Sequence, residues 1–116
     1  MNTSEKPEGV ITYDEVMNVK LRTAKVLEAE KVEGADKLLK LQVEVGDEKR
    51  QLVAGIARYY SAEEVVGKTI VIVANLKPAK IRGVESQGML LCASIGDHLK
   101  LITVDGELPA TGALVK

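Results

Sequence analysis

Apolar and polar residues alternate along much of the chain with the period of two that is typical of half-buried β-strands. The clearest example is the run LKLQVEV at residues 39–45, in which every second side chain is apolar. Gly46-Asp47 follows as a turn signal, and the chain returns as another strand-like run over residues 49–54. The pattern therefore predicts a β-hairpin with one face in the core.

A longer strand precedes this hairpin, over residues 19–32, and its alternation changes phase. Val19 and Leu21 share one phase, whereas Ala24 and Val26 take the opposite one. Such a change indicates a β-bulge or a sharp coil within the strand. A long bent first strand suits a small barrel, in which one strand takes part in both halves of the sheet.

Two short helices are predicted by capping boxes, in which a Ser or Thr is followed three residues later by Glu. The first pattern is TYDE at residues 12–15, and its helix is expected to end near Asn18. The second is SAEE at residues 61–64, and Gly67 is expected to stop its helix. The side chains of the first helix that are expected to dock on the sheet are Tyr13, Val16 and Met17.

A polar segment lies between two apolar runs of β type, TIVIVA at residues 69–74 and MLLCA at residues 89–93. Its first half, residues 75–83, is called the basic loop, because it has three cations and no acidic residue. The cations of the basic loop are Lys77, Lys80 and Arg82. In an extended chain Lys80 and Arg82 project to the same side. Positive charge held between two buried strands is suited to bind phosphates.

Neighbouring side chains add the other groups that a nucleic-acid site needs. Ser86 offers a hydroxyl, Gln87 an amide, and Met89 a polarizable thioether at the start of the next strand. Together with cations, such groups can contact phosphates, riboses and bases. The same composition also fits a solvated loop in which Gly and Pro only form turns.

The run NLKPAKIRGVESQGMLL at residues 75–91 resembles the tRNA-binding domain shared by the C-terminal part of bacterial methionyl-tRNA synthetases and by free-standing tRNA-binding proteins. It is also similar to endothelial monocyte-activating polypeptide II-like domains. Four other segments agree with that domain in the same order. They are LRTAKV at 21–26, GADKL at 34–38, QVEVG at 42–46 and RQLVAGIA at 50–57. The resemblance covers the chain from about Ile11 to the C-terminus.

For the fold, the resemblance implies a mainly β protein. The expected architecture is a five-stranded OB-fold Greek-key barrel with short capping helices, formed by residues 11–116 as one domain. Residues 1–10 are polar and are expected to be a disordered lead or a linker. The extension over about residues 96–116 is too apolar for a solvated tail, so it is expected to pack on the barrel or on a partner. In the resembled family this extension and the N-terminal helix form a homodimer interface.

For function, the resemblance implies a non-catalytic module that binds folded tRNA with little base specificity. Such a module, the C-terminal domain of a methionyl-tRNA synthetase, would raise the tRNA affinity of the catalytic part. The positions carried over as RNA-binding are Asn75, Lys77, Lys80, Arg82, Ser86 and Met89. The family commonly has Asp at the position of Lys20, so Arg22 is interpreted as structural first and as an RNA contact second. The alternative function is that of a dimeric, export-related, chaperone-like protein of the same fold, which would bind unfolded polypeptides.

The composition of the chain limits the other classes of function that it could have. The formal net charge of −1 argues against indiscriminate nucleic-acid binding but is compatible with a local basic patch. A single cysteine and the lack of a long apolar run fit a cytoplasmic protein without an internal disulfide. The only histidine, His98, has no Cys or His near it in the sequence, so neither a metal site, a cofactor nor a base for Ser86 is predicted. Cys92 lies in an apolar run and is expected to be buried and inert.

Overall fold

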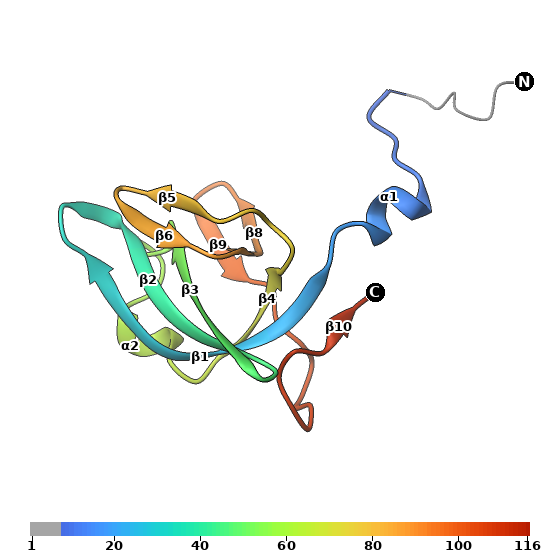
Figure 1. The fold of residues 1–116 in the computed structure, drawn as a ribbon. Helices are drawn as coiled ribbons and strands as arrows, with labels where there is room; N and C mark the ends of the chain where they lie inside the picture. Colours follow the sequence, from blue (N-terminus) through green and yellow to red (C-terminus); the bar gives the residue numbers. More distant parts are fainter. Residues whose placement is uncertain (1–7) are drawn as a thin grey trace, which may run out of the picture.

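The computed structural model describes residues 8–116. Most of the predicted lead over residues 1–10 therefore lies outside the described residues. The predicted mainly β architecture is confirmed (Figure 1). Among the described residues the main sheet has six strands, of which five follow the order β3-β2-β1-β4-β7 and the sixth, β10 (Leu114–Val115), pairs with β1 off this path. The five are β1 (Leu21–Val32), β2 (Ala35–Val45), β3 (Glu48–Ala54), β4 (Thr69–Val73) and β7 (Met89–Leu90).

The first strand is long and irregular, as its change of phase predicts. Residues 21–25 of β1 pair with β4, and residues 25–32 pair with β2. The register shifts between Val26 and Glu28, which confirms an irregularity in this strand. One bent strand thus belongs to both halves of the sheet, and the sheet can curve around a single core.

The core comes from the alternating strands. Leu39 and Leu41 of β2 are fully buried, as are Leu52 of β3 and Ile70 and Ile72 of β4. The intervening polar residues of β2 are more exposed, so the period of two correctly separates the two faces. Because each such side chain contributes about 1.5–3 kcal/mol on burial, these strands dominate the stability of the barrel.

Both predicted capping boxes are present. Thr12 caps α1 (Tyr13–Met17) and Ser61 caps α2 (Ala62–Val65), each exchanging hydrogen bonds with the Glu three residues later. The backbone N–H of Ser61 donates to Glu64, and this hydrogen bond holds the pKa of the Glu64 carboxyl below its usual value. Helix α2 inserts the fully buried Val65 into the core.

The expected docking of α1 on the sheet is wrong. Helix α1 has no buried residue, and the side chain of Tyr13 is 76% exposed. The helix stands away from the barrel at the end of an extended arm (Figure 1). Local capping forms this helix, but capping does not determine where its apolar face packs.

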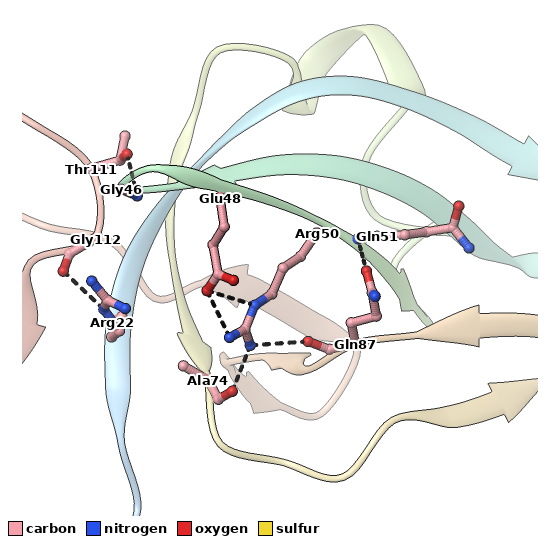
Figure 2. Close-up of polar contacts among 9 residues, drawn as sticks. All are labelled: Arg22, Gly46, Glu48, Arg50, Gln51, Ala74, Gln87, Thr111 and Gly112. Atoms are coloured by element: carbon pink, nitrogen blue, oxygen red, sulfur yellow. Dashed lines mark hydrogen bonds and ion pairs between the residues drawn. The ribbon is translucent and has the colours of Figure 1, made fainter.

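The C-terminal extension does pack on the barrel. Two short strands, β8 (Cys92–Ile95) and β9 (His98–Leu101), form a hairpin, and β10 (Leu114–Val115) pairs with the start of β1. Arg22 donates from Nε to the carbonyl of Gly112 at 3.0 Å, and Thr111 Oγ1 accepts from the N–H of Gly46 at 2.9 Å (Figure 2). Arg22 therefore has the structural role that was its first interpretation.

The predicted strand over residues 89–95 is interrupted. Strand β7 ends at Leu90, and β8 begins at Cys92 and pairs with β9 instead of continuing along β4. Cys92 is half-buried rather than fully buried, and its partial burial raises the pKa of its thiol.

Candidate nucleic-acid interface

The basic loop is a hairpin in the structure. Strands β5 (Ala79–Ile81) and β6 (Val84–Ser86) pair antiparallel, with Lys80 opposite Glu85. We call residues 79–86 the basic hairpin. Its two-residue turn is Arg82-Gly83, and both residues have positive φ, 54° and 81°. Two successive residues with positive φ are typical of the tightest hairpin turns, whose twist matches that of the strands.

The extended geometry expected for Lys80 and Arg82 is wrong, because the turn begins at Arg82. Strand β5 ends at Ile81, so Arg82 lies at the tip and not on the same strand as Lys80. Arg82 is the one non-glycine residue with positive φ in the described part of the chain. That conformation costs an ordinary L-residue about 1–2 kcal/mol. The two-residue turn requires this conformation, and the strain motivates the hypothesis that an arginine at the tip has a function.

The cations of the basic loop are available to a ligand. Lys77, Lys80 and Arg82 are exposed, and none of them forms a hydrogen bond or an ion pair with residues 8–116. Glu85 faces Lys80 across the hairpin but forms no ion pair with it. The tip therefore carries unneutralised positive charge on a protein whose formal net charge is −1.

An open cleft of about 500 Å³ lies between the tip of this hairpin and two other segments. The start of β2 contributes Lys37, the segment before α2 contributes Arg58, and the hairpin contributes Ile81 and Arg82. Asp36 is the one acidic residue in the lining. The cleft therefore adds two cations, Lys37 and Arg58, to those of the hairpin.

Sequence reasoning missed Arg58. It left two interpretations for Lys37, a place on an outer face near the basic loop or ordinary surface charge, and favoured the second. The two residues are 21 positions apart along the chain and belong to segments with no basic run. A cluster of Lys or Arg is a sequence signal only when its members are close along the chain. Here the barrel brings them together, and the sequence carries no local mark of it.

Ser86 lies inside the protein. Its side chain is 3% exposed, its hydroxyl accepts from the N–H of Val53 at 3.0 Å, and it donates to the carbonyl of Gly88 at 2.9 Å. Both hydrogen-bonding functions of the hydroxyl are thus used within the fold. This position places Ser86 behind the surface, where it joins β6 to β3.

Asn75 and Met89 lie on the surface near the base of the hairpin. Asn75 uses its side-chain amide to hold the arm before β1, accepting from the N–H of Lys20 at 2.9 Å and donating to the carbonyl of Asn18 at 2.7 Å. Met89 is 49% exposed. The structure therefore brings four predicted site residues to an exposed surface with free side chains, namely Lys77, Lys80, Arg82 and Met89.

The hairpin is attached to the barrel through the edge of β3. The N–H of Gln51 donates to the side chain of Gln87 at 2.9 Å, and the N–H of Gln87 donates to the carbonyl of Gln51 at 2.7 Å. The side chain of Gln51 donates to the carbonyl of Glu85 at 2.7 Å. Figure 2 shows the Gln51–Gln87 contact beside Arg50. Side-chain amides thus satisfy an edge that a neighbouring strand would otherwise cover.

Within the described range there is no group of three or more His, Cys, Asp or Glu residues that could hold a metal ion. No helix among residues 8–116 is long and apolar enough to cross a membrane. What the site offers is unpaired positive charge, held on a hairpin and around a cleft. Together the fold and the site define a small β-barrel that displays unpaired cations around one open cleft.

The comparisons identify the family. The chain belongs to the tRNA-binding domain family, whose model matches residues 21–113. It is 59% identical over 108 residues to a methionine–tRNA ligase of Thermotoga maritima, covering 93% of this chain and 17% of that protein. The chain thus spans about a sixth of the length of this relative. A match to one tRNA-binding domain confirms the prediction of a binding module that is not itself an enzyme.

Solved structures agree with this assignment. The crystal structure of a MetRS-related protein from Pyrococcus horikoshii has a TM-score of 0.86 and 42% identity, covering 92% of this chain and 98% of that one. A CsaA chaperone protein from Picrophilus torridus has a TM-score of 0.83 and 30% identity, with 92% and 100% covered. The predicted barrel fold is confirmed.

Proposed function

We propose that this domain binds the phosphate backbone of folded tRNA through the basic loop, the basic hairpin and the adjoining cleft. Five cations would contact phosphates: Lys37, Arg58, Lys77, Lys80 and Arg82. The observation that carries the proposal is that three segments far apart in the sequence present unpaired cations around one cleft. Few aromatic side chains are available for stacking, because the chain has three Tyr and neither Phe nor Trp. Recognition would therefore rely on shape and phosphates rather than on bases.

Within a whole protein the domain would act as the C-terminal module of a methionine–tRNA ligase, adding tRNA affinity to the catalytic part. The identity to such ligases, which extends over 93% of this chain, supports this placement. Met89 would add an apolar contact beside the hairpin. Asn75 and Ser86, whose polar groups have partners within the protein, would hold the surface in place.

The domain would function as a homodimer. Helix α1 and strand β10 present apolar side chains that the single chain leaves exposed, including Tyr13 at 76% and Leu114 at 64%. Among the described strands, β10 pairs only with β1, so its other edge is open. A second copy could cover both elements and would double the number of basic hairpins. Sedimentation equilibrium at micromolar concentration should give the mass of two chains, and Leu114→Asp should give the mass of one.

Titration of labelled bulk tRNA at two salt concentrations tests the main proposal. The variant Lys80→Ala/Arg82→Ala should lose affinity and salt sensitivity while its thermal melt stays unchanged. A matched control is Lys25→Ala/Lys68→Ala, which removes two exposed lysines from segments that do not line the cleft. Equal losses of tRNA affinity in both variants would mean that binding depends only on the net charge of the protein. Folded tRNA should compete better than a single-stranded RNA of equal length.

The chaperone-like alternative has one observation in its favour, the structural likeness to a CsaA chaperone protein at 30% identity. The same preparations should therefore be tested for suppression of aggregation of an unfolded protein. Suppression without salt-sensitive tRNA binding would favour that alternative over the tRNA-binding proposal.

A further inference from the structure

Residues 74–88 leave the barrel at the end of β4 and return to it at β7. Strands β4 and β7 are neighbours, and their pairing begins at Val73 and Met89. This pairing comprises two residue pairs, and the basic hairpin itself comprises three. So short a two-stranded hairpin is not stable by itself in water. Unpaired cations on it add mutual repulsion, so its order must come from the barrel.

Arg50 of β3 lies at the neck of this excursion and touches both of its ends. Its Nη1 donates to the carbonyl of Ala74, where the chain leaves, and to the carbonyl of Gln87 at 3.3 Å, where the chain returns (Figure 2). A planar guanidinium can donate to both carbonyls from Nη1 while its Nε and Nη2 pair with Glu48, a combination that a single ammonium could not reproduce in the same geometry.

Glu48 holds the guanidinium in position. Its Oε1 accepts from Arg50 Nε at 3.1 Å and from Nη2 at 2.8 Å (Figure 2). The side chain of Arg50 is 20% exposed, and its donors on all three nitrogens are engaged within the protein. Arg50 is therefore a cation near the RNA surface that is not free to contact RNA.

We propose that Arg50 is a positioning residue, which closes the neck of residues 74–88 and so pre-organises the basic hairpin for phosphate binding. The claim that this order strengthens RNA binding rests on the proposed function. The claim that Arg50 orders the hairpin does not, because it concerns the protein without RNA. A hairpin ordered before binding loses less conformational entropy when the complex forms, so its cations bind phosphate more tightly.

The test is Arg50→Lys, which keeps the charge but removes the fork. Arg22→Lys is the matched control, since it makes the same chemical change at a part-buried arginine that donates to the carbonyl of Gly112 and not to the hairpin. Amide hydrogen exchange is measured first, on the free proteins, for a peptide spanning residues 79–86 and for a core peptide of β2. We expect the hairpin amides of Arg50→Lys to exchange about tenfold faster or more, with β2 unchanged, and the hairpin amides of Arg22→Lys to match the wild type.

Binding of labelled tRNA then supplies the second readout. Arg50→Lys should raise the Kd about tenfold while leaving the slope of log K against log salt unchanged, because no phosphate contact is lost. A slope smaller by about one would make Arg50 a phosphate contact and overturn the inference. Unchanged exchange of the hairpin, or a hairpin unprotected in the wild type, would also overturn it. If the hairpin of Arg50→Lys exchanges faster but even the wild type binds no tRNA, the proposed function is rejected and the inference about the hairpin stands.

If Arg50→Lys fails to fold, Glu48→Gln serves as the milder variant. It keeps Arg50 and removes the carboxylate that orients it. Removal of an acidic charge near a phosphate-binding surface strengthens RNA binding when only charge matters. The inference predicts the opposite sign, namely faster hairpin exchange and weaker tRNA binding. Tighter binding with normal hairpin protection would overturn it.

Discussion

Replacement of Arg82 by Asn separates the two roles of the hairpin tip, forming a turn and presenting a positive charge. Arg82 has φ of 54° in a turn whose second residue, Gly83, has φ of 81°. Asn tolerates this left-handed conformation better than other non-glycine residues, and Asn-Gly is a favoured sequence for such two-residue turns. Arg82→Asn should therefore strengthen the turn, by up to about 1 kcal/mol, while it removes the cation.

The effect on RNA binding should have the opposite sign. With about five phosphate contacts per domain, the wild type should show a slope of log K against log salt of roughly −3.5 to −4.5, at about 0.7–0.9 per phosphate. Loss of one contact should reduce the magnitude of the slope by about 0.7–0.9. Loss of a charge-assisted hydrogen bond should raise the Kd about tenfold.

The assay combines a thermal melt with tRNA titrations over a salt series. Arg82→Lys is the control, because it keeps both the charge and the conformational strain, so its slope and melting temperature should stay near those of the wild type. A slope for Arg82→Asn equal to that of the wild type would refute the assignment of the tip to RNA. A clear fall in melting temperature would refute the argument about the turn.

Three further predictions concern the interior and the C-terminal extension. Ser86→Ala should destabilise the protein by about 1–3 kcal/mol in urea unfolding, because the N–H of Val53 loses its buried acceptor; a fully stable variant that only binds tRNA less well would contradict this internal role. Gly112→Ala should cost about 2 kcal/mol or more by the same measurement, since φ is +82° and a Cβ would lie 2.8 Å from the N of Gly46; an unchanged unfolding midpoint would show that the extension does not dock in this way. Burial raises the pKa of Cys92, so the folded state holds this proton more tightly than the unfolded state, and the resulting stability is present below about pH 9 and lost as pH rises further. The fall in stability between about pH 8 and about pH 10 should thus be smaller for Cys92→Ala than for the wild type, and equal falls would reject this contribution.

Much of the barrel could be predicted from the sequence because its signals are local. Alternation marks the faces of β2, the change of phase marks the irregularity of β1, and the capping boxes mark the starts of α1 and α2. Each depends on residues within a few positions of one another, so each is visible before anything is known about packing. The same holds for the cations of the basic loop, which are close along the chain.

Contacts between distant segments could not be predicted in this way. Helix α1 was expected on the sheet, but none of its residues is buried within the described chain. Arg50 was expected on an outer face, either near the basic loop or as ordinary surface charge, yet its guanidinium lies between the carbonyls of Ala74 and Gln87. Ser86 resembled a contact residue, yet its hydroxyl lies behind the hairpin and bonds to β3.

The sequence by itself determined the elements, their inward faces and the segment that carries the charge, because periodicity, capping and local charge are properties of neighbouring residues. Only the tertiary structure decided which polar side chains are free. It placed Lys37 and Arg58 beside Arg82 around one cleft, and it turned Arg50 and Ser86 inward. The physical reason is that the availability of a polar group depends on the partners that surround it after folding, and here those partners lie tens of residues away.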